Sequence, residues 1–227
     1  MLVLIDGDIV CYRCAAVTEN DNAELAKWQA DELIRRILSD VNSSDYKIYI
    51  SGDNNFRYNL YPEYKANRKD KPKPKYLEHI REHLLLEWNA SITDGYEADD
   101  ALGINQSTNS IIASIDKDLL QVEGRHFNFV QRSFHELTIN NGWYNFYMQL
   151  LIGDAADNIP GCPGIGKVKA PRILEKYDTS FDWYNACADA YLKAGVTLDV
   201  MHRNAQLLYI WRKEDDQWSK PEKQQPV

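Results

Sequence analysis

Short apolar runs alternate with helical patterns over the first 130 residues of the chain. Helices are predicted at residues 23–41 and 76–88, where apolar positions recur every three to four residues, and another should begin within 97–104. Four apolar runs bounded by polar or turn residues predict buried strands: residues 2–5, 46–50, 110–115 and 126–130. Strands that alternate with helices predict an α/β fold whose mostly parallel sheet is covered on both faces.

The pattern changes at residue 143. An apolar helix is predicted at residues 143–153, a turn-rich run follows, and a second helix is predicted at residues 167–177. Together they form a helix-loop-helix hairpin of the size of a supersecondary unit.

These patterns predict a division of the chain into three parts. Residues 1–142 form the main domain, and a helix at about 198–213 packs back on it and completes it. Residues 143–197 form the helical module. Residues 214–227 are polar and are predicted to be a disordered tail.

Composition is that of a globular protein with a sizeable core, with 44% hydrophobic and 26% charged residues. The N-terminus has no basic region before its apolar run, so no signal peptide is expected, and no stretch reaches membrane-spanning length. Cys11 and Cys14 lack the further cysteines or histidines of a zinc site, which favours small core residues on the first helix.

Charge is unevenly distributed along the chain, whose net charge is −8. Residues 57–75 hold seven basic and two acidic side chains, and residues 167–176 hold four basic and one acidic. Overall acidity argues against a nucleic-acid partner, whereas these two basic patches favour one.

Acidic residues follow the predicted strands at the points where the strands end. Asp6 ends the first strand, Asp53 follows the second and Asp116 follows the third. Because parallel strands share one carboxyl edge, these side chains are expected to meet there. Six further acids belong to the same set. Asp118 follows Asp116 by two residues, Glu97, Asp99 and Asp100 share one segment, and Asp154 and Asp157 share another.

Nine carboxylates gathered at one edge would repel one another unless cations offset their charge. Oxygen ligands suit Mg²⁺ or Mn²⁺, and two such ions can activate water and stabilise the leaving oxygen of a phosphodiester. Each acid alone could instead cap a helix or form a turn. Their joint placement therefore predicts a two-metal nuclease.

Five blocks of sequence, in this order, resemble the 5′ nuclease family, which includes bacteriophage and bacterial 5′→3′ exonucleases, flap endonucleases, phage RNase H enzymes and the 5′ nuclease domain of DNA polymerase I. The blocks are Phe56-Arg57 with Tyr61–Arg68, Tyr96–Asp100, Ser114–Leu119, Gly153–Gly161 and Gly164–Lys167. The resemblance implies a PIN-like three-layer fold with a helix-three-turn-helix module that binds DNA. It implies hydrolysis near 5′ ends, nicks or flaps of duplex DNA or RNA–DNA hybrids.

The resemblance also assigns roles to individual residues. Lys65 and Arg57 would stabilise the scissile phosphate, Asp116 would be essential for catalysis, and Tyr64 would stack on a terminal base. Those expected to contact DNA further are Arg68, Gly164, Gly166, Lys167 and Lys169. The first metal would be held by Asp6, Asp53, Glu97, Asp99 and Asp100, and the second by Asp116, Asp118, Asp154 and Asp157. The turn at residues 159–165 is compatible with K⁺.

Two departures from the family pattern affect the expected structure. Pro72 and Pro74 disfavour a helix in the short basic segment 69–76, so a loop is expected where larger relatives have a threading arch. Pro171 is expected to delay or kink the second hairpin helix.

Other functions fit parts of the sequence. Gly161 to Lys167 nearly matches a phosphate-binding loop, but Val168 stands where a hydroxyl residue is needed. A PIN-type ribonuclease acting on single-stranded RNA would share the acids but lack the glycine hairpin. A catalytically silent DNA-junction binder would have lost metal ligands. The preferred prediction is a monomeric 5′ nuclease in the cytoplasm of a bacterial or phage-infected cell.

Overall fold

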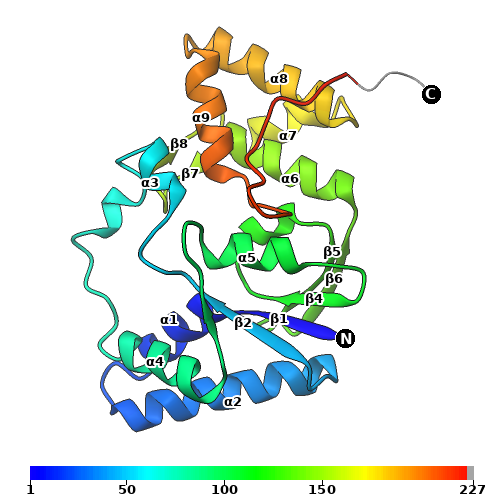
Figure 1. Ribbon diagram of the computed structural model, residues 1–227. Helices are drawn as coiled ribbons and strands as arrows, with labels where there is room; N and C mark the ends of the chain where they lie inside the picture. Colours follow the sequence, from blue (N-terminus) through cyan, green and yellow to red (C-terminus); the bar gives the residue numbers. More distant parts are fainter. Residues whose placement is uncertain (224–227) are drawn as a thin grey trace.

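A six-stranded sheet forms the centre of the computed structural model, which describes residues 1–223 (Figure 1). Its strand order is β3-β2-β1-β4-β5-β6. Neighbouring strands are parallel except for β6, which pairs antiparallel with β5. The strands are β1 (Leu2–Asp6), β2 (Tyr46–Ile50), β3 (Ser91–Ile92), β4 (Ser110–Ala113), β5 (Gly124–Asn128) and β6 (Ser133–Leu137). The predicted mostly parallel α/β sheet is confirmed.

Alternate residues of the central strands pack into two different cores, which makes the domain three-layered. Val3 and Ile5 face α1 (Gly7–Val17), α2 (Ala23–Val41) and α4 (Leu77–Glu87) on one side. Leu4 faces α5 (Ala98–Asn105) on the other side. This period of two follows from the pleat of a strand that is buried on both faces. Cys11 and Cys14 are buried on α1, as predicted.

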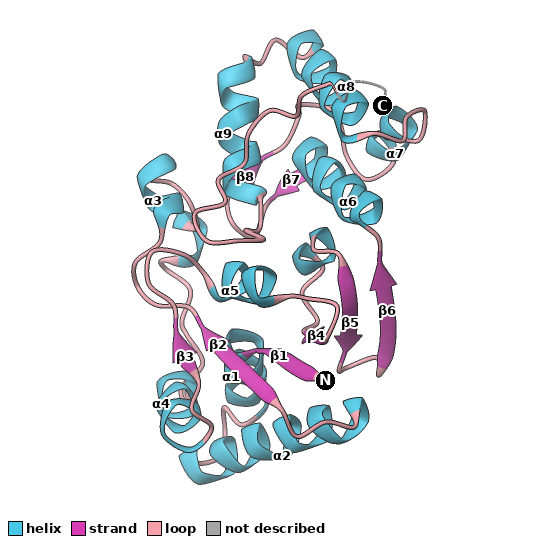
Figure 2. Ribbon diagram, turned by 45° about the vertical axis from the view of Figure 1, so that its right-hand side comes forward, coloured by secondary structure: helices cyan, strands magenta, loops and turns pink. Residues whose placement is uncertain are grey.

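A helical region lies beyond the α5 face of the sheet (Figures 1 and 2). It contains α6 (Ile139–Ile152), β7 (Gly153–Asp154), β8 (Ile159–Pro160), α7 (Lys169–Leu174), α8 (Ser180–Lys193) and α9 (Leu198–Leu208). A single aromatic-rich core joins the four helices. The domain boundary predicted between residues 142 and 143 falls inside α6, so the chain has no linker there.

The end of the chain is packed rather than disordered, contrary to the prediction for residues 214–223. Trp218 is 6% exposed and its ring lies 5.6 Å from that of His202 and 6.1 Å from that of Phe146. The prediction failed because it rested on the polar composition of the segment, which does not reveal that Trp218 is buried. Residues 224–227, the rest of that predicted tail, lie outside the described residues.

The segment after α9, and not the helix α9 itself, completes the sheet domain. The helix predicted to residue 213 ends at Leu208, and the chain then runs extended. Ile210 is buried against Leu4 and Leu102. Non-local packing on the sheet thus outweighs helical periodicity in this segment.

Several elements were absent from the sequence prediction. They are the helix α8, the short helix α3 (Phe56–Leu60), the short strands β3, β6, β7 and β8, and the single turns of 3₁₀ helix at Ala66–Arg68 and Asp118–Gln121. Residues 69–76 form no helix, as predicted from their prolines. In residues 1–223, no helix combines the length and apolarity needed to span a membrane.

Candidate metal centre

Asp6 lies at the carboxyl end of β1, in the middle of the sheet. It caps α1, accepting a hydrogen bond from the backbone N–H of Ile9 at 3.0 Å, and it accepts another from the Ser114 hydroxyl at 2.6 Å. Its side chain is 1% exposed. The pKa of Asp6 is raised to about 7, mainly by burial and to a smaller extent by the charges of Asp8 and Asp116, while the two hydrogen bonds act in the opposite direction.

Asp99 joins Asp6 from the first turn of α5. Burial raises the pKa of Asp99 well above its usual value, and the charges of Asp6, Asp116 and Glu97 act in the same direction. Asp116 lies after β4, where its backbone N–H donates to the Ser114 hydroxyl at 3.0 Å. Carboxylates from β1, α5 and the end of β4 are therefore close enough to repel one another.

A second acidic group adjoins the first. The pKa of Asp118 is raised to about 7, mainly by burial, with a smaller contribution from repulsion by Asp116 and Asp154. Asp154, in β7, is 8% exposed and accepts a hydrogen bond from the backbone N–H of Ala156 at 2.7 Å. Asp116 faces both groups, so it links the sheet edge to the helical region.

Tyr64 and Lys65 bridge Glu97 to Asp157. The Tyr64 hydroxyl lies 2.9 Å from Glu97 Oε2 and 3.0 Å from Asp157 Oδ2. The Lys65 ammonium contacts Glu97 directly and lies 3.7 Å from Asp157 Oδ2, and Arg68 forms an ion pair with Asp157. Burial would raise the pKa of Glu97, but the charges of Lys65 and Arg57 hold it below its usual value.

Arg57 and Asp100 form a buried ion pair with each other, which corrects both predicted roles. The Arg57 guanidinium donates to the two Asp100 oxygens at 2.6 and 2.9 Å, and the two side chains are 3% and 0% exposed. Arg57 also donates to the carbonyl of Leu207, and Asp100 accepts from the N–H of Trp211. Neither group has a face free for phosphate or metal.

Tyr64 and Asp53 also differ from their predicted roles. Tyr64 is 2% exposed, with its hydroxyl turned to two acids, so it cannot stack on a terminal base. Asp53 is exposed on the loop after β2, and within residues 1–223 no hydrogen bond or ion pair joins it to the acidic groups. The structure does not bring Asp53 into either acidic group.

Asp8 was missed as part of the site. It lies in the first turn of α1, two residues after Asp6, and it accepts hydrogen bonds from Arg81 and from the backbone N–H of Ser51, each at 3.0 Å. Burial raises the pKa of Asp8, and the Glu97 charge adds to this. The string Asp6-Gly7-Asp8 was the available signal, because residues at the start of a helix after a strand share the strand's carboxyl edge.

The donor set fits divalent cations, although the acids do not yet enclose one. Within residues 1–223, no three Asp, Glu, His or Cys side chains form a closed metal-binding cluster. The acids lie instead as two open groups of like charge. The charge of Lys65 lowers the pKa of Asp99 and that of Lys117 lowers the pKa of Asp118, yet the pKa values of Asp6, Asp99 and Asp118 all remain raised, so the basic groups offset the repulsion only in part. A hard cation with oxygen ligands would relieve that repulsion.

The glycine turn lies exposed between β8 and α7. Gly164 has φ of 73°, a conformation that favours glycine, and a Cβ there or at Gly166 would point into open space. Lys167 and Lys169 are exposed, and the Lys169 ammonium donates to the Gly164 carbonyl at 2.9 Å. The turn therefore presents backbone N–H groups and positive charge to a partner.

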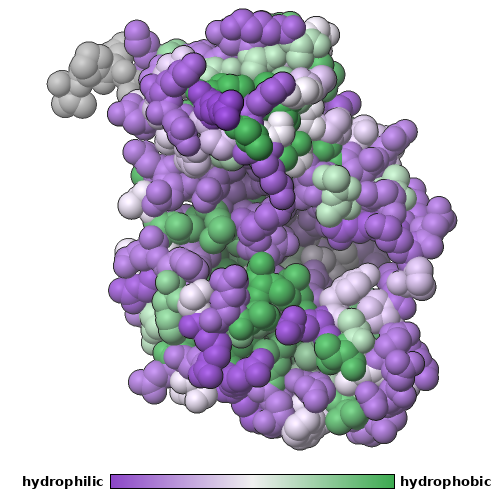
Figure 3. All heavy atoms as spheres, turned by 180° about the vertical axis from the view of Figure 1, so that it is seen from behind, coloured by the Kyte–Doolittle hydropathy of each residue, from purple (hydrophilic) through white to green (hydrophobic). Residues whose placement is uncertain are grey.

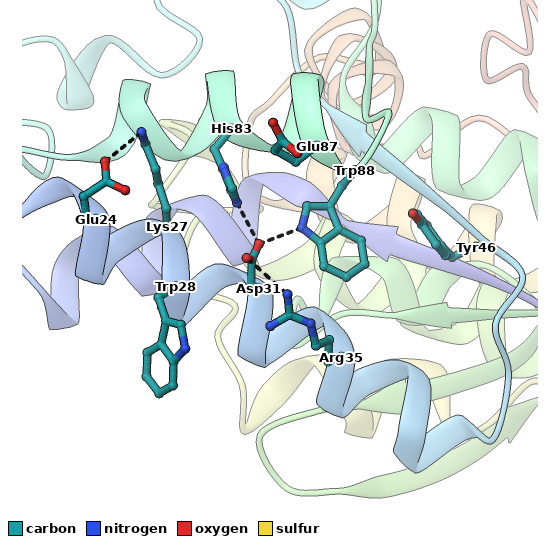
Figure 4. A pocket seen from close by; sticks show the side chains of 9 residues that line it. All are labelled: Glu24, Lys27, Trp28, Asp31, Arg35, Tyr46, His83, Glu87 and Trp88. Carbon is teal, nitrogen blue, oxygen red and sulfur yellow. Dashed lines mark hydrogen bonds and ion pairs between the residues drawn. The ribbon is translucent and has the colours of Figure 1, made fainter.

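A pocket of about 450 Å³ between α2 and α4 lies apart from the acids (Figure 4). Asp31 at its floor is satisfied by the indole N–H of Trp88 and by His83, each at 2.7 Å. Lys27 pairs with Glu24, and Arg35 pairs with Asp31, so most of the ionic groups of the pocket are paired with one another. The surface seen from behind is mostly hydrophilic, with apolar residues gathered in patches (Figure 3).

Comparison with known proteins supports one family. The family model for the 5′-3′ exonuclease, N-terminal resolvase-like domain, matches residues 1–145. DNA polymerase I of Caldicellulosiruptor bescii is 31% identical over 216 residues, which are 81% of this chain and 25% of the polymerase. Flap endonuclease Xni of Shewanella putrefaciens is 27% identical over 226 residues, which are 91% of this chain and 86% of that protein. The chain thus spans about a quarter of the polymerase relative.

Solved structures share the fold. The bacteriophage T5 5′-exonuclease with zinc bound superposes with a TM-score of 0.71 at 18% identity, covering 91% of this chain and 88% of that one. The catalytic core of Rad2 in complex with DNA substrate superposes with a TM-score of 0.52 at 14% identity, covering 95% of this chain and 79% of that one.

Proposed function

Because this chain belongs to the family of the 5′-3′ exonuclease N-terminal, resolvase-like domain, we propose that it hydrolyses phosphodiester bonds near the 5′ ends, nicks or flaps of duplex DNA. The observation that carries the proposal is the meeting of buried and half-buried, mutually repelling carboxylates from β1, α5, the end of β4 and β7 beside Lys65. A structural role alone would not favour so many carboxylates whose repulsion is only partly offset at one sheet edge.

Two divalent cations, Mg²⁺ or Mn²⁺, would supply a charge that activates water and stabilises the leaving oxygen. Asp6, Asp99 and Asp116 are the residues that would hold the first. Asp118, Asp154 and Asp157 would hold the second, with Asp116 lying between the groups. Glu97 borders the first group through its contact with Lys65.

Lys65 and Arg68 would act on the substrate phosphate. They contact Glu97 and Asp157, so their charges already lie at the border of the acidic groups. From this border the two positive charges would attract the scissile phosphate. A fixed positive clamp of this kind favours the charge that develops during phosphodiester hydrolysis.

The exposed glycine turn would bind the duplex away from the cleavage point. Gly164 and Gly166 leave room for phosphates to reach backbone N–H groups, and Lys167 and Lys169 add charge without reading sequence. K⁺ within residues 159–165, an RNA–DNA hybrid as a further substrate, a monomeric state and a cytoplasmic location complete the proposal.

A substrate panel tests the proposal. The protein would be mixed with 5′-labelled nicked, flapped and hybrid duplexes and with single-stranded RNA, in millimolar Mg²⁺, in Mn²⁺ or in chelator. The duplexes are expected to give short products when metal is present and none in chelator. Cleavage of single-stranded RNA in preference to every duplex would favour the PIN-type ribonuclease, and intact substrates with folded protein would exclude an enzyme.

Asp116→Asn is expected to slow cleavage at least about 100-fold, because the carboxylate that lies between the two acidic groups is lost. Duplex binding should remain within about threefold, since the glycine turn is untouched. Gel cleavage and fluorescence anisotropy measure the two effects. Asp189→Asn, an exposed acid on α8, serves as the matched control. Retained cleavage in Asp116→Asn would remove Asp116 from the centre.

A further inference from the structure

We propose that Arg81 of α4 is a positioning residue for the metal centre, which holds Asp8 away from the cation-binding acids and fixes the start of α5. The inference deepens the proposed function and rests on it. Arg81 lies outside every block of sequence that resembles the nuclease family, so its assignment depends on the contacts of this structure.

Arg81 contacts Asp8 and Ser51, and its Nε also lies 3.6 Å from Glu78 Oε2 on its own helix. One guanidinium nitrogen donates to Asp8 Oδ1 at 3.0 Å, and the other donates to the Ser51 carbonyl at 2.6 Å. The Ser51 N–H donates to Asp8 Oδ2 at 3.0 Å. Both Asp8 oxygens are therefore engaged, and the carboxylate has a single orientation. The side chains of Arg81 and Asp8 are 23% and 31% exposed, so solvent screens the pair only in part.

Ser51 carries the contact onward to the metal centre. Its hydroxyl accepts a hydrogen bond from the backbone N–H of Ala98 at 2.9 Å. Ala98 is the first residue of α5 and stands between Glu97 and Asp99 in the chain. Fixing the end of β2 through Arg81 thus fixes the point from which these two acids project.

Charge gives Arg81 a second effect. Asp8 lies two residues from Asp6. The charge of Asp8 raises the pKa of Asp6, and the charge of Glu97 raises the pKa of Asp8. Among residues 1–223, Arg81 is the one basic group that forms an ion pair with Asp8. Without it, a freed carboxylate at the border of the acidic groups would turn toward bound cations and compete with the ligands that the reaction needs.

Arg81 also connects the centre to the basic segment 69–76. That segment leads directly into α4, and Arg81 lies on the second turn of that helix. A substrate strand held by residues 69–76 would therefore bear on the same helix that fixes Asp8.

Binding of Mn²⁺ to the DNA-free protein, followed by the electron paramagnetic resonance of free Mn²⁺, tests this role apart from cleavage. In Arg81→Gln the uncompensated Asp8 should make Mn²⁺ bind at least about threefold more tightly, yet kcat should fall at least about tenfold with little change in KM. Arg81→Lys keeps the charge and should bind Mn²⁺ within about twofold of the original protein. The double variant Asp8→Asn/Arg81→Gln should return Mn²⁺ affinity to the original value and recover much of kcat.

Arg35→Gln is the matched control, because Arg35 forms ion pairs on the α2 surface away from the acids and should change neither quantity. Thermal unfolding of each variant confirms folding. Unchanged Mn²⁺ affinity in Arg81→Gln, or a loss of kcat that Asp8→Asn does not relieve, would overturn the proposal. If the original protein cleaves none of the duplexes, the proposed function fails, while the Mn²⁺ titrations still decide whether Arg81 acts through Asp8.

Discussion

The guanidinium of Arg57 is enclosed by acceptors. Besides the two oxygens of Asp100, it donates to the carbonyls of Leu207 and Tyr209 at 2.8 and 2.9 Å. Buried charges of this kind are tolerated when every donor has an acceptor. Arg57 therefore stabilises the joint between α3, α5 and the chain after α9 rather than the reacting phosphate.

Arg57→Met is expected to lower the free energy of unfolding by about 3–5 kcal/mol, because Asp100 would remain buried without its partner. Arg57→Met/Asp100→Leu removes both charges and should be less destabilised than the single variant. Denaturant unfolding of the metal-free proteins measures both. A single variant as stable as the original protein would show that Asp100 is solvated rather than buried.

Sequence spacing could predict that Asp6 and Asp116 lie at one edge of the sheet, but not the exposure of Asp53, the pairing of Asp100 with Arg57, or the different surroundings of Arg57 and Lys65. Asp6 and Asp116 follow strands, so topology alone brings them to one edge. Arg57 and Lys65 both lie in a basic segment and differ only in burial. The burial of Arg57 depends on residues 207–211. One of its hydrogen bonds joins residues that are 150 positions apart in the chain, and no local sequence pattern predicts such a contact.

At the scale of elements, the helices and strands with a clear period of their own were predictable. The helix at Ala23–Val41 and the strand at Tyr46–Ile50 begin and end where the pattern places them. β3 has two residues and α3 has five, too few for any period to show. β6 is an edge strand with mixed exposure, held by its pairing with β5, a contact that sequence patterning does not reveal.

The glycine turn gives a prediction for an element. Gly164→Ala should destabilise the free protein by about 1 kcal/mol, because φ of 73° strains a residue that has a Cβ. Gly166→Ala, whose backbone needs no left-handed conformation, is the matched control and should leave stability unchanged. Both should weaken duplex binding about threefold to tenfold, since either Cβ obstructs a phosphate. Unfolding and anisotropy measurements separate strain from obstruction, and unaltered binding in both would place the duplex elsewhere.

At the scale of the whole molecule, acidity is concentrated where cations would offset it. The net charge is −8, while the raised pKa values of Asp6 and Asp118 lie at the acidic groups. Folding brings these carboxylates together against their repulsion, so the metal-free fold bears a cost that bound cations remove.

Stability should therefore depend on pH in the direction opposite to that of a carboxylate in a salt bridge. The folded-state pKa values of Asp6 and Asp118, about 7, lie above the ordinary 3.8, so the folded protein binds more protons between those values and stability falls as pH rises through them. In chelator, the Tm should be lower at about pH 8 than at about pH 5.5, by about 2–4 °C for each kcal/mol. Millimolar Mg²⁺ should raise the Tm at the higher pH. Asp6→Asn/Asp118→Asn should flatten the dependence, and a Tm that rises with pH in chelator would contradict the assignment.

The hydrogen bonds from residues 207–211 back to Arg57 and Asp100 set an order in which a newly made chain becomes competent. Every acid of the centre precedes residue 158, so the carboxylates leave the ribosome before the segment that completes their surroundings. A nascent chain stopped after α8 carries all of them, yet Arg57 lacks two acceptors and Asp100 lacks a donor. The structure thus ties the completion of the surroundings of Arg57 and Asp100 to the synthesis of residues 207–211.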